Sequence, residues 1–349
     1  MKFKFNNVFV TGANGWLGYQ LVKTLLEGDE DVIDNFNNNN CRVTSFILNG
    51  DEKSKISSHN INHSIYEGDI RNIDDCKSFF KDTENSILFH LAGIIHPKNT
   101  SEFYDINYEG TKNVVESAIL SGIKKIVVMS SNSPIGCNKD KFSPFNEESK
   151  YNPYMHYGKS KMMMEKYLIE KINKGVDITI IRSPWFYGDN MPKRQLIFYK
   201  MIQNGYVPVI GNGENLRSKA HIKNIIQGLL KTTFYEISKG KIYWIADEKP
   251  YSYNFIIDTT RKIMKEKFDL KTKKANIKLP FFFGQIAQLC DYVLQYLSFY
   301  NQKIHVLSEL NKNIYCSIET AKKEIDFKPK INFESGMIKI ITENINLFK

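Results

Sequence analysis

Tyr157 and Lys161 have the residue types and the spacing that acid–base chemistry on a hydroxyl group needs. They stand four positions apart in the segment YGKSK, and the serines Ser130, Ser131 and Ser133 lie upstream. On a helix, positions i and i+4 share one face, so the ammonium group can lie near the phenol. A positive charge there favours the phenolate and lowers its pKa from the usual value of about 10. Such a phenol can take or give a proton.

A glycine-rich segment, TGANGWLG (Thr11 to Gly18), follows an apolar run near the N-terminus. Gly12 allows a tight turn, Gly15 lets the backbone approach a pyrophosphate, and Gly18 lets a helix pack close to a strand. The N-terminus of that helix would face the phosphates with its partial positive charge. This motif predicts a dinucleotide cofactor, NAD or NADP, and a hydride transfer for which Tyr157 moves the proton.

The end of the second expected strand normally separates the two cofactors. An acidic residue there favours NAD, whereas an arginine accommodates the extra phosphate of NADP. This chain has the run Leu48, Asn49, Gly50, Asp51, Glu52 and Lys53 at that place. Neither pattern is clean, so the choice stays open.

Short apolar runs alternate with helical patterns through the first half of the chain, which predicts an α/β fold: a Rossmann-type, doubly wound parallel sheet with helices on both faces. Residues 1–182 are expected to form this domain. The expected strands are 5–10, 43–48, 64–66, 86–91, 125–129 and 177–181, and the expected helices are 16–26, 74–81, 107–120 and 155–172.

The pattern is looser in residues 183–349, which we expect to form mainly a smaller α/β substrate-binding lobe, with segments around 217–250 returning to the first domain. The segment SPWFYGDNMP is expected to be a loop. Further expected elements are a helix over 195–203, a strand and turn over 207–214, a strand over 241–245 and a helix over 253–265.

The stretch from Pro280 to Tyr300 is the most apolar of the chain, although Gln285, Asp291 and Gln295 interrupt it. These polar groups argue against a membrane span, and we expect no integral membrane segment. Our leading interpretation is a core or lobe-packing helix. A substrate tunnel or a peripheral membrane face is the alternative.

The net charge of +10 fits an anionic small-molecule substrate. Nucleic acid is not expected as a partner, because the lysines form no dense basic block. Five cysteines without a C-x-x-C pair indicate reduced thiols, and we expect no metal site. The N-terminal segment lacks the features of a signal peptide, so we expect a cytoplasmic protein.

The order and spacing of TGANGWLG, GDIRN, HLAG, the serine cluster and YGKSK resemble the extended short-chain dehydrogenase/reductase family, the NAD-dependent epimerase/dehydratases. This resemblance implies that Asn107 supports the catalytic Lys161. It also implies a homodimer, commonly formed through helices that include the tyrosine helix. The implied cofactor-binding residues are Gly12, Asn14, Gly15, Trp16, Leu17, Gly18, Asp69, Ile70, Leu91, Ala92, Gly93, Tyr157, Lys161 and Pro184.

The resemblance assigns the catalytic hydroxyl to Ser131, and Ser133 stays a candidate because the residues after Ser131 depart from the family pattern. Such a hydroxyl would hold the substrate oxygen. His96 could face the substrate or be a loop residue. Arg217 matches the place of a phosphate-binding arginine in nucleotide-sugar members of the family, or it is a surface charge.

These observations favour an NAD(P)-dependent epimerase/dehydratase or oxidoreductase that acts on a hydroxyl or keto carbon, with a nucleotide sugar as the leading substrate. A ketone, hydroxysteroid or dihydroflavonol-type reductase is the alternative. A non-catalytic NAD(P)-sensing protein is a further alternative, which would have no need of Tyr157 and Lys161.

Overall fold

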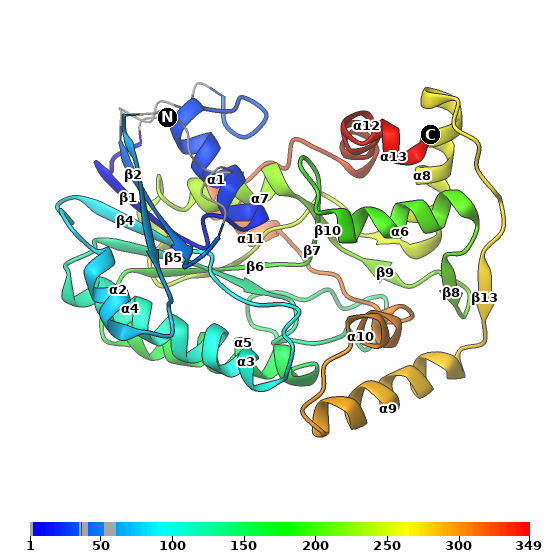
Figure 1. The fold of residues 1–349 in the computed structure, drawn as a ribbon, viewed down its shortest axis with the longest axis horizontal. Coiled ribbons are helices and arrows are strands. Elements are labelled where there is room, and N and C mark those ends of the chain that lie inside the picture. Colours follow the sequence, from blue (N-terminus) through cyan, green and yellow to red (C-terminus); the bar gives the residue numbers. More distant parts are fainter. Residues whose placement is uncertain (1–2, 35, 37–40, 52–60) are drawn as a thin grey trace.

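Runs of buried Val, Ile, Leu and Phe form a seven-stranded sheet. Figure 1 shows this large sheet as a ribbon. The structure, a computed structural model, describes residues 3–34, 36, 41–51 and 61–349. The strand order is β11-β6-β5-β4-β1-β2-β3, and all neighbours are parallel. The strands are β1 (Asn7–Thr11), β2 (Arg42–Leu48), β3 (His63–Gly68), β4 (Ser86–His90), β5 (Lys125–Ser131), β6 (Ile178–Ser183) and β11 (Ile242–Trp244).

Helices cover both faces of this sheet, which confirms the predicted doubly wound fold. One face packs against α1 (Trp16–Glu27), α7 (Ile222–Lys231) and α11 (Glu319–Ile325). The other packs against α2 (Ile73–Phe79), α4 (Thr111–Leu120) and α5 (Met155–Asn173). The chain enters at β1 and winds outward in both directions, so β1 and β4 are neighbours at the switch point of the sheet. Ligands of open α/β sheets bind beyond the carboxyl ends of such strands.

The helix predicted over 107–120 begins earlier and is irregular. It consists of α3 (Ser101–Tyr104), a π-helical turn η2 (Asp105–Gly110) and then α4. Gly110 lies against Ile70, where an added Cβ would come within 2.8 Å of that side chain. Asn107 belongs to the π turn, and such turns often occur at functional sites.

The smaller part of the molecule has its own core between α6 (Lys193–Asn204), α8 (Tyr253–Phe268), α12 (Phe333–Glu343) and α13 (Ile345–Phe348). Short strand pairs connect it: β7 (Trp185–Tyr187) with β10 (Lys219–His221), β9 (Leu216–Arg217) with β12 (Tyr251–Ser252), and β8 (Pro208–Ile210) with β13 (Ile277–Leu279). A 3-10 turn, η3 (Glu236–Ser238), precedes β11. The expectation that SPWFYGDNMP is wholly a loop is wrong, because β7 finds its partner β10 far along the chain.

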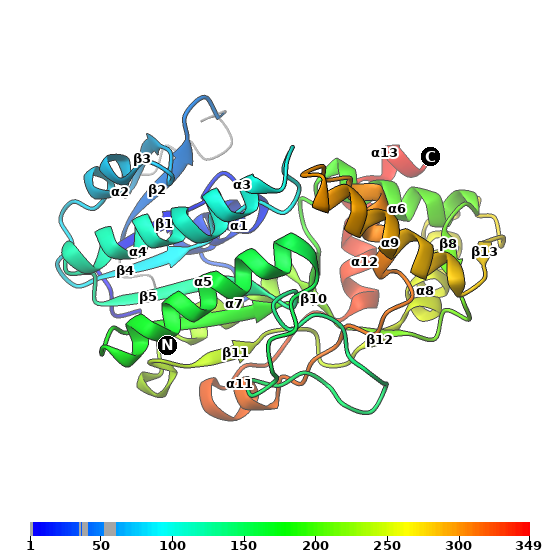
Figure 2. The same ribbon diagram turned by 90° about the horizontal axis from the view of Figure 1, so that it is seen from below.

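Of the leading interpretation of the 280–300 stretch, a core or lobe-packing helix, the core part is wrong and the packing against its own lobe is confirmed. The stretch forms α9 (Phe282–Tyr296), which packs on α10 (Gln302–Glu309) at the outside of the smaller part. Its large apolar residues face outward, and it lies in the foreground of Figure 2. Within the described ranges, no helix combines the length and the hydropathy needed to cross a bilayer.

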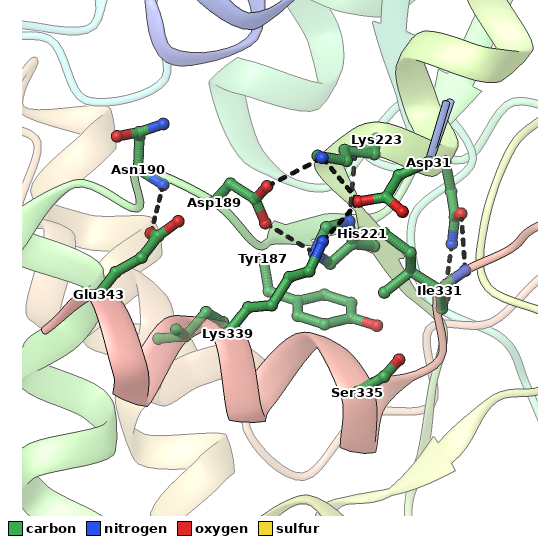
Figure 3. Close-up of polar contacts among 12 residues, drawn as sticks. Asp31, Tyr187, Asp189, Asn190, His221, Lys223, Ile331, Ser335, Lys339 and Glu343 are labelled. Atoms are coloured by element: carbon green, nitrogen blue, oxygen red, sulfur yellow. Dashed lines mark hydrogen bonds and ion pairs between the residues drawn. The ribbon is translucent and has the colours of Figure 1, made fainter. Parts of the chain in front are cut away.

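An ion-pair network holds the loop after α1 against the smaller part (Figure 3). The Lys223 Nζ lies 2.8 Å from Asp29, 2.9 Å from Asp31 and 3.3 Å from Asp189. Lys339 of α12 reaches Asp31 at 2.6 Å. Hydrogen bonds from Lys339 and Lys223 lower the pKa of Asp31 to about 2. The network therefore fixes the junction beside the glycine motif.

Candidate active site

The glycine motif forms the turn between β1 and α1. Gly12 has φ of +69°, and a Cβ there would lie 2.7 Å from the Ala92 backbone nitrogen, just after β4. A Cβ on Gly18 would come within 2.1 Å of the Gly12 carbonyl oxygen. Glycine is therefore required at both places by the close approach of strand, turn and helix.

The start of α1 has the features of a phosphate site. Gly15 is the N-cap residue, and no side chain caps the first turn, so the helix presents free N–H groups. The Oδ1 of Asn14 is buried without a hydrogen-bond partner. An uncapped helix end beside an orphaned polar atom fits a bound dinucleotide. Leu17 is buried under the turn, and the Trp16 indole donates to the Asp189 carbonyl at 2.7 Å.

The segment after β4 links this turn to the tyrosine helix. A Cβ on Gly93 would lie 3.0 Å from the Asn107 Oδ1 and 3.6 Å from the Lys161 Nζ. The buried Asn107 accepts from the Ile94 N–H at 2.8 Å and donates to the Ile94 carbonyl at 3.0 Å and to the Ser160 Oγ at 3.2 Å. Asn107 thus ties Ile94, the residue after Leu91, Ala92 and Gly93, to Ser160 of α5, and none of these three bonds involves Lys161.

Tyr157 lies near the start of α5 and hydrogen-bonds to Ser131 at the end of β5. Its ring packs 5.7 Å from that of Phe103. Burial raises the pKa of Tyr157 to about 12, although the bond with Ser131 opposes the rise. The expectation of a lowered pKa is wrong for the protein alone, because loss of water around the phenolate outweighs the hydrogen bond with Ser131.

Lys161 is one helical turn beyond Tyr157 and is buried. Its Nζ donates to the Met129 carbonyl at 3.1 Å and lies 3.6 Å from the Met164 sulfur. Burial lowers the pKa of Lys161 to about 8. The ammonium group is therefore held between β5 and the Gly93 backbone, at the carboxyl ends of the central strands.

The three serines of the cluster have different surroundings. Ser130 donates to Glu165 at 2.5 Å, and Glu165 forms a buried ion pair with Arg182 at 2.7 Å. Ser131 and Ser133 lie 3.3 Å apart, and Ser131 is the one that reaches Tyr157. The pair of Glu165 and Arg182 was not predicted from the sequence. The position of Glu165, four residues after Lys161 on the same helix, was the available signal.

Other predicted residues occupy the edge of this region. His96 Nδ1 lies 2.8 Å from the Tyr300 hydroxyl, and burial lowers the pKa of His96 to about 4. Asp69 pairs with Arg71 at 2.5 Å. Ile70 and Pro184 are buried. Glu52 and Lys53, which belong to the run considered for the choice between NAD and NADP, lie outside the described residues.

Arg217 is buried, contrary to the alternative of a surface charge, and it lines a second polar region. Its Nη2 donates to the Glu309 carbonyl, and its guanidinium lies 4.8 Å from the Trp185 ring. The Nε and Nη1 of Arg217 and the hydroxyl of Tyr253 are buried without a partner. The Lys219 Nζ lies over the same Trp185 ring, 5.1 Å from its centre. Burial lowers the pKa of Lys219 to about 7.

Glu309 connects the surroundings of Tyr157 with those of Arg217. Its charge helps to raise the pKa of Tyr157, and its backbone carbonyl accepts a hydrogen bond from Arg217. Trp185, Lys219, Tyr253 and Glu309 were not predicted. They come from four elements that are distant in sequence, and no motif joins them. In the described part of the chain, no cluster of His, Cys, Asp or Glu could hold a metal ion.

The doubly wound sheet and the phosphate-cradling turn at its switch point define a dinucleotide-dependent enzyme. Comparison with known proteins gives the family. The model of the NAD dependent epimerase/dehydratase family matches residues 8–246, and the chain belongs to this family. Its cofactor is accordingly NAD, one of the two expected from the glycine motif.

Relatives extend over nearly the whole chain. An uncharacterized protein of Sinorhizobium fredii, y4nL, is 41% identical and aligns with 95% of this chain and 92% of its own length. The N-acetyl-alpha-D-glucosaminyl-diphospho-ditrans,octacis-undecaprenol 4-epimerase of Escherichia coli O157:H7 is 25% identical and aligns with 89% of this chain and 86% of its own length. The UDP-glucose 4-epimerase of Thermotoga maritima shares the fold, with a TM-score of 0.75, 18% identity, and coverage of 98% and 100%.

Proposed function

We propose that the protein is an NAD-dependent epimerase that acts on a hydroxyl-bearing carbon of a sugar linked to a diphosphate, with a nucleotide sugar as the first candidate. The observation that carries this proposal is the buried guanidinium of Arg217, whose Nε and Nη1 have no partner. Buried donors without partners are costly, and a diphosphate would satisfy them with charge-assisted bonds. Lys219 lies on the same Trp185 ring as Arg217, and a bound diphosphate would favour its charged form.

Tyr157 is the proposed acid and base of the reaction. Its phenolate would remove the proton of the sugar hydroxyl, while Ser131 would donate a hydrogen bond to the same oxygen. Lys161 would stabilise the phenolate, and Asn107 would hold the segment around Gly93 in place. Bound NAD supplies a hydride acceptor that can return the hydride. A hydride returned to the opposite face of the keto sugar would invert the carbon and leave no net oxidation.

The diphosphate can be carried by a nucleoside or by a polyprenol, and both carriers present the same charged group to Arg217. The E. coli relative is named for a sugar on undecaprenyl diphosphate. Assays with a UDP-sugar and with the same sugar on a short-chain prenyl diphosphate would separate the two sources.

The test is the Arg217→Ala variant. Since the diphosphate lies away from the reacting carbon and is held throughout, KM should rise with a smaller change in kcat. The expected loss is about 1.5–3 kcal/mol, or roughly one to two orders of magnitude in kcat/KM. Arg217→Lys should recover only part of it, because lysine lacks the planar fork.

Arg42→Ala, which removes an exposed arginine at the start of β2, is the matched control. Unfolding temperatures of all variants separate a binding defect from misfolding. An Arg217→Ala protein that stays folded and keeps the wild-type KM for every diphosphate sugar would refute the proposal.

A reductase of uncharged ketones or hydroxysteroids is the second candidate. The aromatic surroundings of Tyr157 favour it, since Phe103 packs on both Tyr157 and Tyr300, at 5.7 and 5.4 Å. For such a substrate Arg217→Ala should leave KM unchanged, and turnover should consume or produce one NADH per product.

A further inference from the structure

The helix α9 has its apolar side outside. Phe282, Ile286, Leu289, Val293 and Tyr296 recur at spacings of four and three, so they form one stripe along the helix. All five are exposed, with Leu289 at 63% and Tyr296 at 77%. The stripe continues at both ends through further exposed apolar residues, namely Phe281, Leu297 and Phe299. Contiguous exposed apolar surface of this kind marks an interaction site.

The inward side of α9 is small and polar. The buried Asp291 contacts the His305 Nδ1 at 2.8 Å and accepts from Gln295 at 2.8 Å. Gln295 in turn accepts from the backbone N–H of His156, at the start of the tyrosine helix, at 3.2 Å. Gly284 lies so close to Asn311 that a Cβ would meet it at 2.5 Å.

These contacts fix the rotation of the helix. Turning α9 over would bury the stripe but break the bonds of Asp291 and Gln295. The hydrogen bonds of the inner side therefore specify the outward orientation of the apolar stripe.

A basic segment leads into this helix. Residues 261–278 contain eight lysines and arginines against two acidic residues, Glu266 and Asp269. The seven lysines are all exposed: Lys262, Lys265, Lys267, Lys271, Lys273, Lys274 and Lys278. The chain passes from α8 through β13 to α9 along one end of the molecule (Figures 1 and 2). Lys273, Lys274 and Lys278 thus lie in the segment that enters α9, at the start of the apolar stripe.

We propose that α9 and this basic segment form a docking surface for a lipid bilayer that contains anionic headgroups. A helix with an outward apolar stripe rich in Phe, Tyr and Leu suits the boundary between headgroups and acyl chains. Lysines beside it suit anionic lipids, whose surface potential attracts basic segments. The polar inward side and the length of 15 residues suit a helix that lies in the plane of the membrane surface.

The docking surface is continuous with the candidate active site. After α9, the Ser298 carbonyl accepts from the Thr100 N–H at 3.2 Å, and Phe299 bridges to Asn99. The next residue, Tyr300, bonds His96 and packs on Phe103, which contacts Tyr157. Docking through α9 would therefore place this edge of the active site close to the membrane. The docking itself does not depend on the proposed reaction.

Vesicle flotation with the full-length protein tests the proposal. Wild type should float with vesicles of phosphatidylcholine and phosphatidylglycerol and less with phosphatidylcholine alone. Leu289→Glu with Tyr296→Glu should weaken binding to both kinds of vesicle by about tenfold or more, because two charges enter the apolar stripe. Lys274→Glu with Lys278→Glu should weaken binding to the anionic vesicles alone, also by about tenfold or more.

The matched controls are Ile237→Glu, at a residue 51% exposed in η3, and Lys139→Glu with Lys141→Glu in an exposed loop. Both should float like wild type, and unchanged unfolding temperatures show that the variants are folded. Wild type that stays unbound to anionic vesicles would overturn the proposal. An α9 variant that turns a dimer into a monomer by light scattering, with no vesicle binding by wild type, would assign the stripe to a second copy of the chain instead.

Discussion

At the scale of single residues, Tyr157 is the group on which the proposed chemistry depends. Tyr157→Phe removes the hydroxyl and leaves the ring that packs on Phe103. Turnover should fall by about 10² to 10⁴-fold, the usual contribution of general acid–base catalysis. The affinity for NAD, measured by calorimetry, should stay close to that of wild type. A variant that keeps more than about a tenth of the wild-type rate would exclude this role for Tyr157.

The pH dependence of the rate follows from the pKa values of Tyr157 and Lys161. Burial raises the pKa of Tyr157 to about 12, so the phenolate is scarce at neutral pH and oxidation should quicken as pH rises. Lys161 assists the phenolate only while charged, and burial lowers its pKa to about 8. The increase in kcat/KM should therefore become less steep above about pH 8.

In Lys161→Met that bend should disappear, and the rising limb should move to higher pH, because the stabilising charge is absent at every pH. Lys159→Met removes an exposed lysine from the same helix and should leave the profile unchanged. Identical pH profiles for wild type and Lys161→Met would contradict the assignment.

At the scale of elements, the network around Lys223 joins the loop after α1 to α12 and to the segment after β7. Lys223→Met would leave Asp29, Asp31 and Asp189 near one another without their shared cation. We expect the free energy of unfolding to fall by about 2 kcal/mol, less than for a fully buried pair, because the Asp31 side chain is 49% exposed. Lys328→Met, at an exposed pair with Asp326, should change the free energy of unfolding far less.

The same network predicts a dependence on acid. The pKa of Asp31 is lowered to about 2 in the folded protein from 3.8. Its contribution to stability is therefore present above about pH 3.8 and lost as pH falls through about 2. Without Lys223 the pKa of Asp31 rises, so acid unfolding followed by circular dichroism should begin at a higher pH. An unchanged acid midpoint would show that the network contributes little.

Elements whose pattern is local could be predicted from the sequence, and elements that depend on distant partners could not. The strands around Val8, Leu88 and Val127 are buried on both faces, so uninterrupted apolar runs identify them. The three-residue strand at Phe186 exists because it pairs with Ala220, and no local pattern shows that pairing. The helix before Gly110 contains a π turn that hydropathy alone does not mark.

The candidate site divides in the same way. Gly12, Gly18, Tyr157 and Lys161 could be placed from spacing, because the turn and the helix are each one continuous segment. Arg217 could be singled out by its motif, whereas its neighbours Trp185 and Tyr253 come together only through tertiary packing.

At the scale of the whole molecule, α9 lies at the outside of the smaller part, packed on α10. The apolar composition of α9 indicated burial, yet Asp291 and Gln295 occupy its inner side. Composition therefore predicted the helix but not its orientation, which is decided by hydrogen bonds to His305 and His156.

The proposed reaction is the inversion of one carbon of a diphosphate-linked sugar. The most direct measurement is proton NMR of a UDP-sugar panel incubated with the protein and catalytic NAD, because couplings around the sugar ring report the configuration of each carbon. We predict that one substrate is converted to an epimer until equilibrium, with no net NADH, and that Tyr157→Phe abolishes the conversion. If every sugar, including prenyl diphosphate sugars, remains unchanged, or if product forms only with one NADH consumed per turnover, the claim is contradicted.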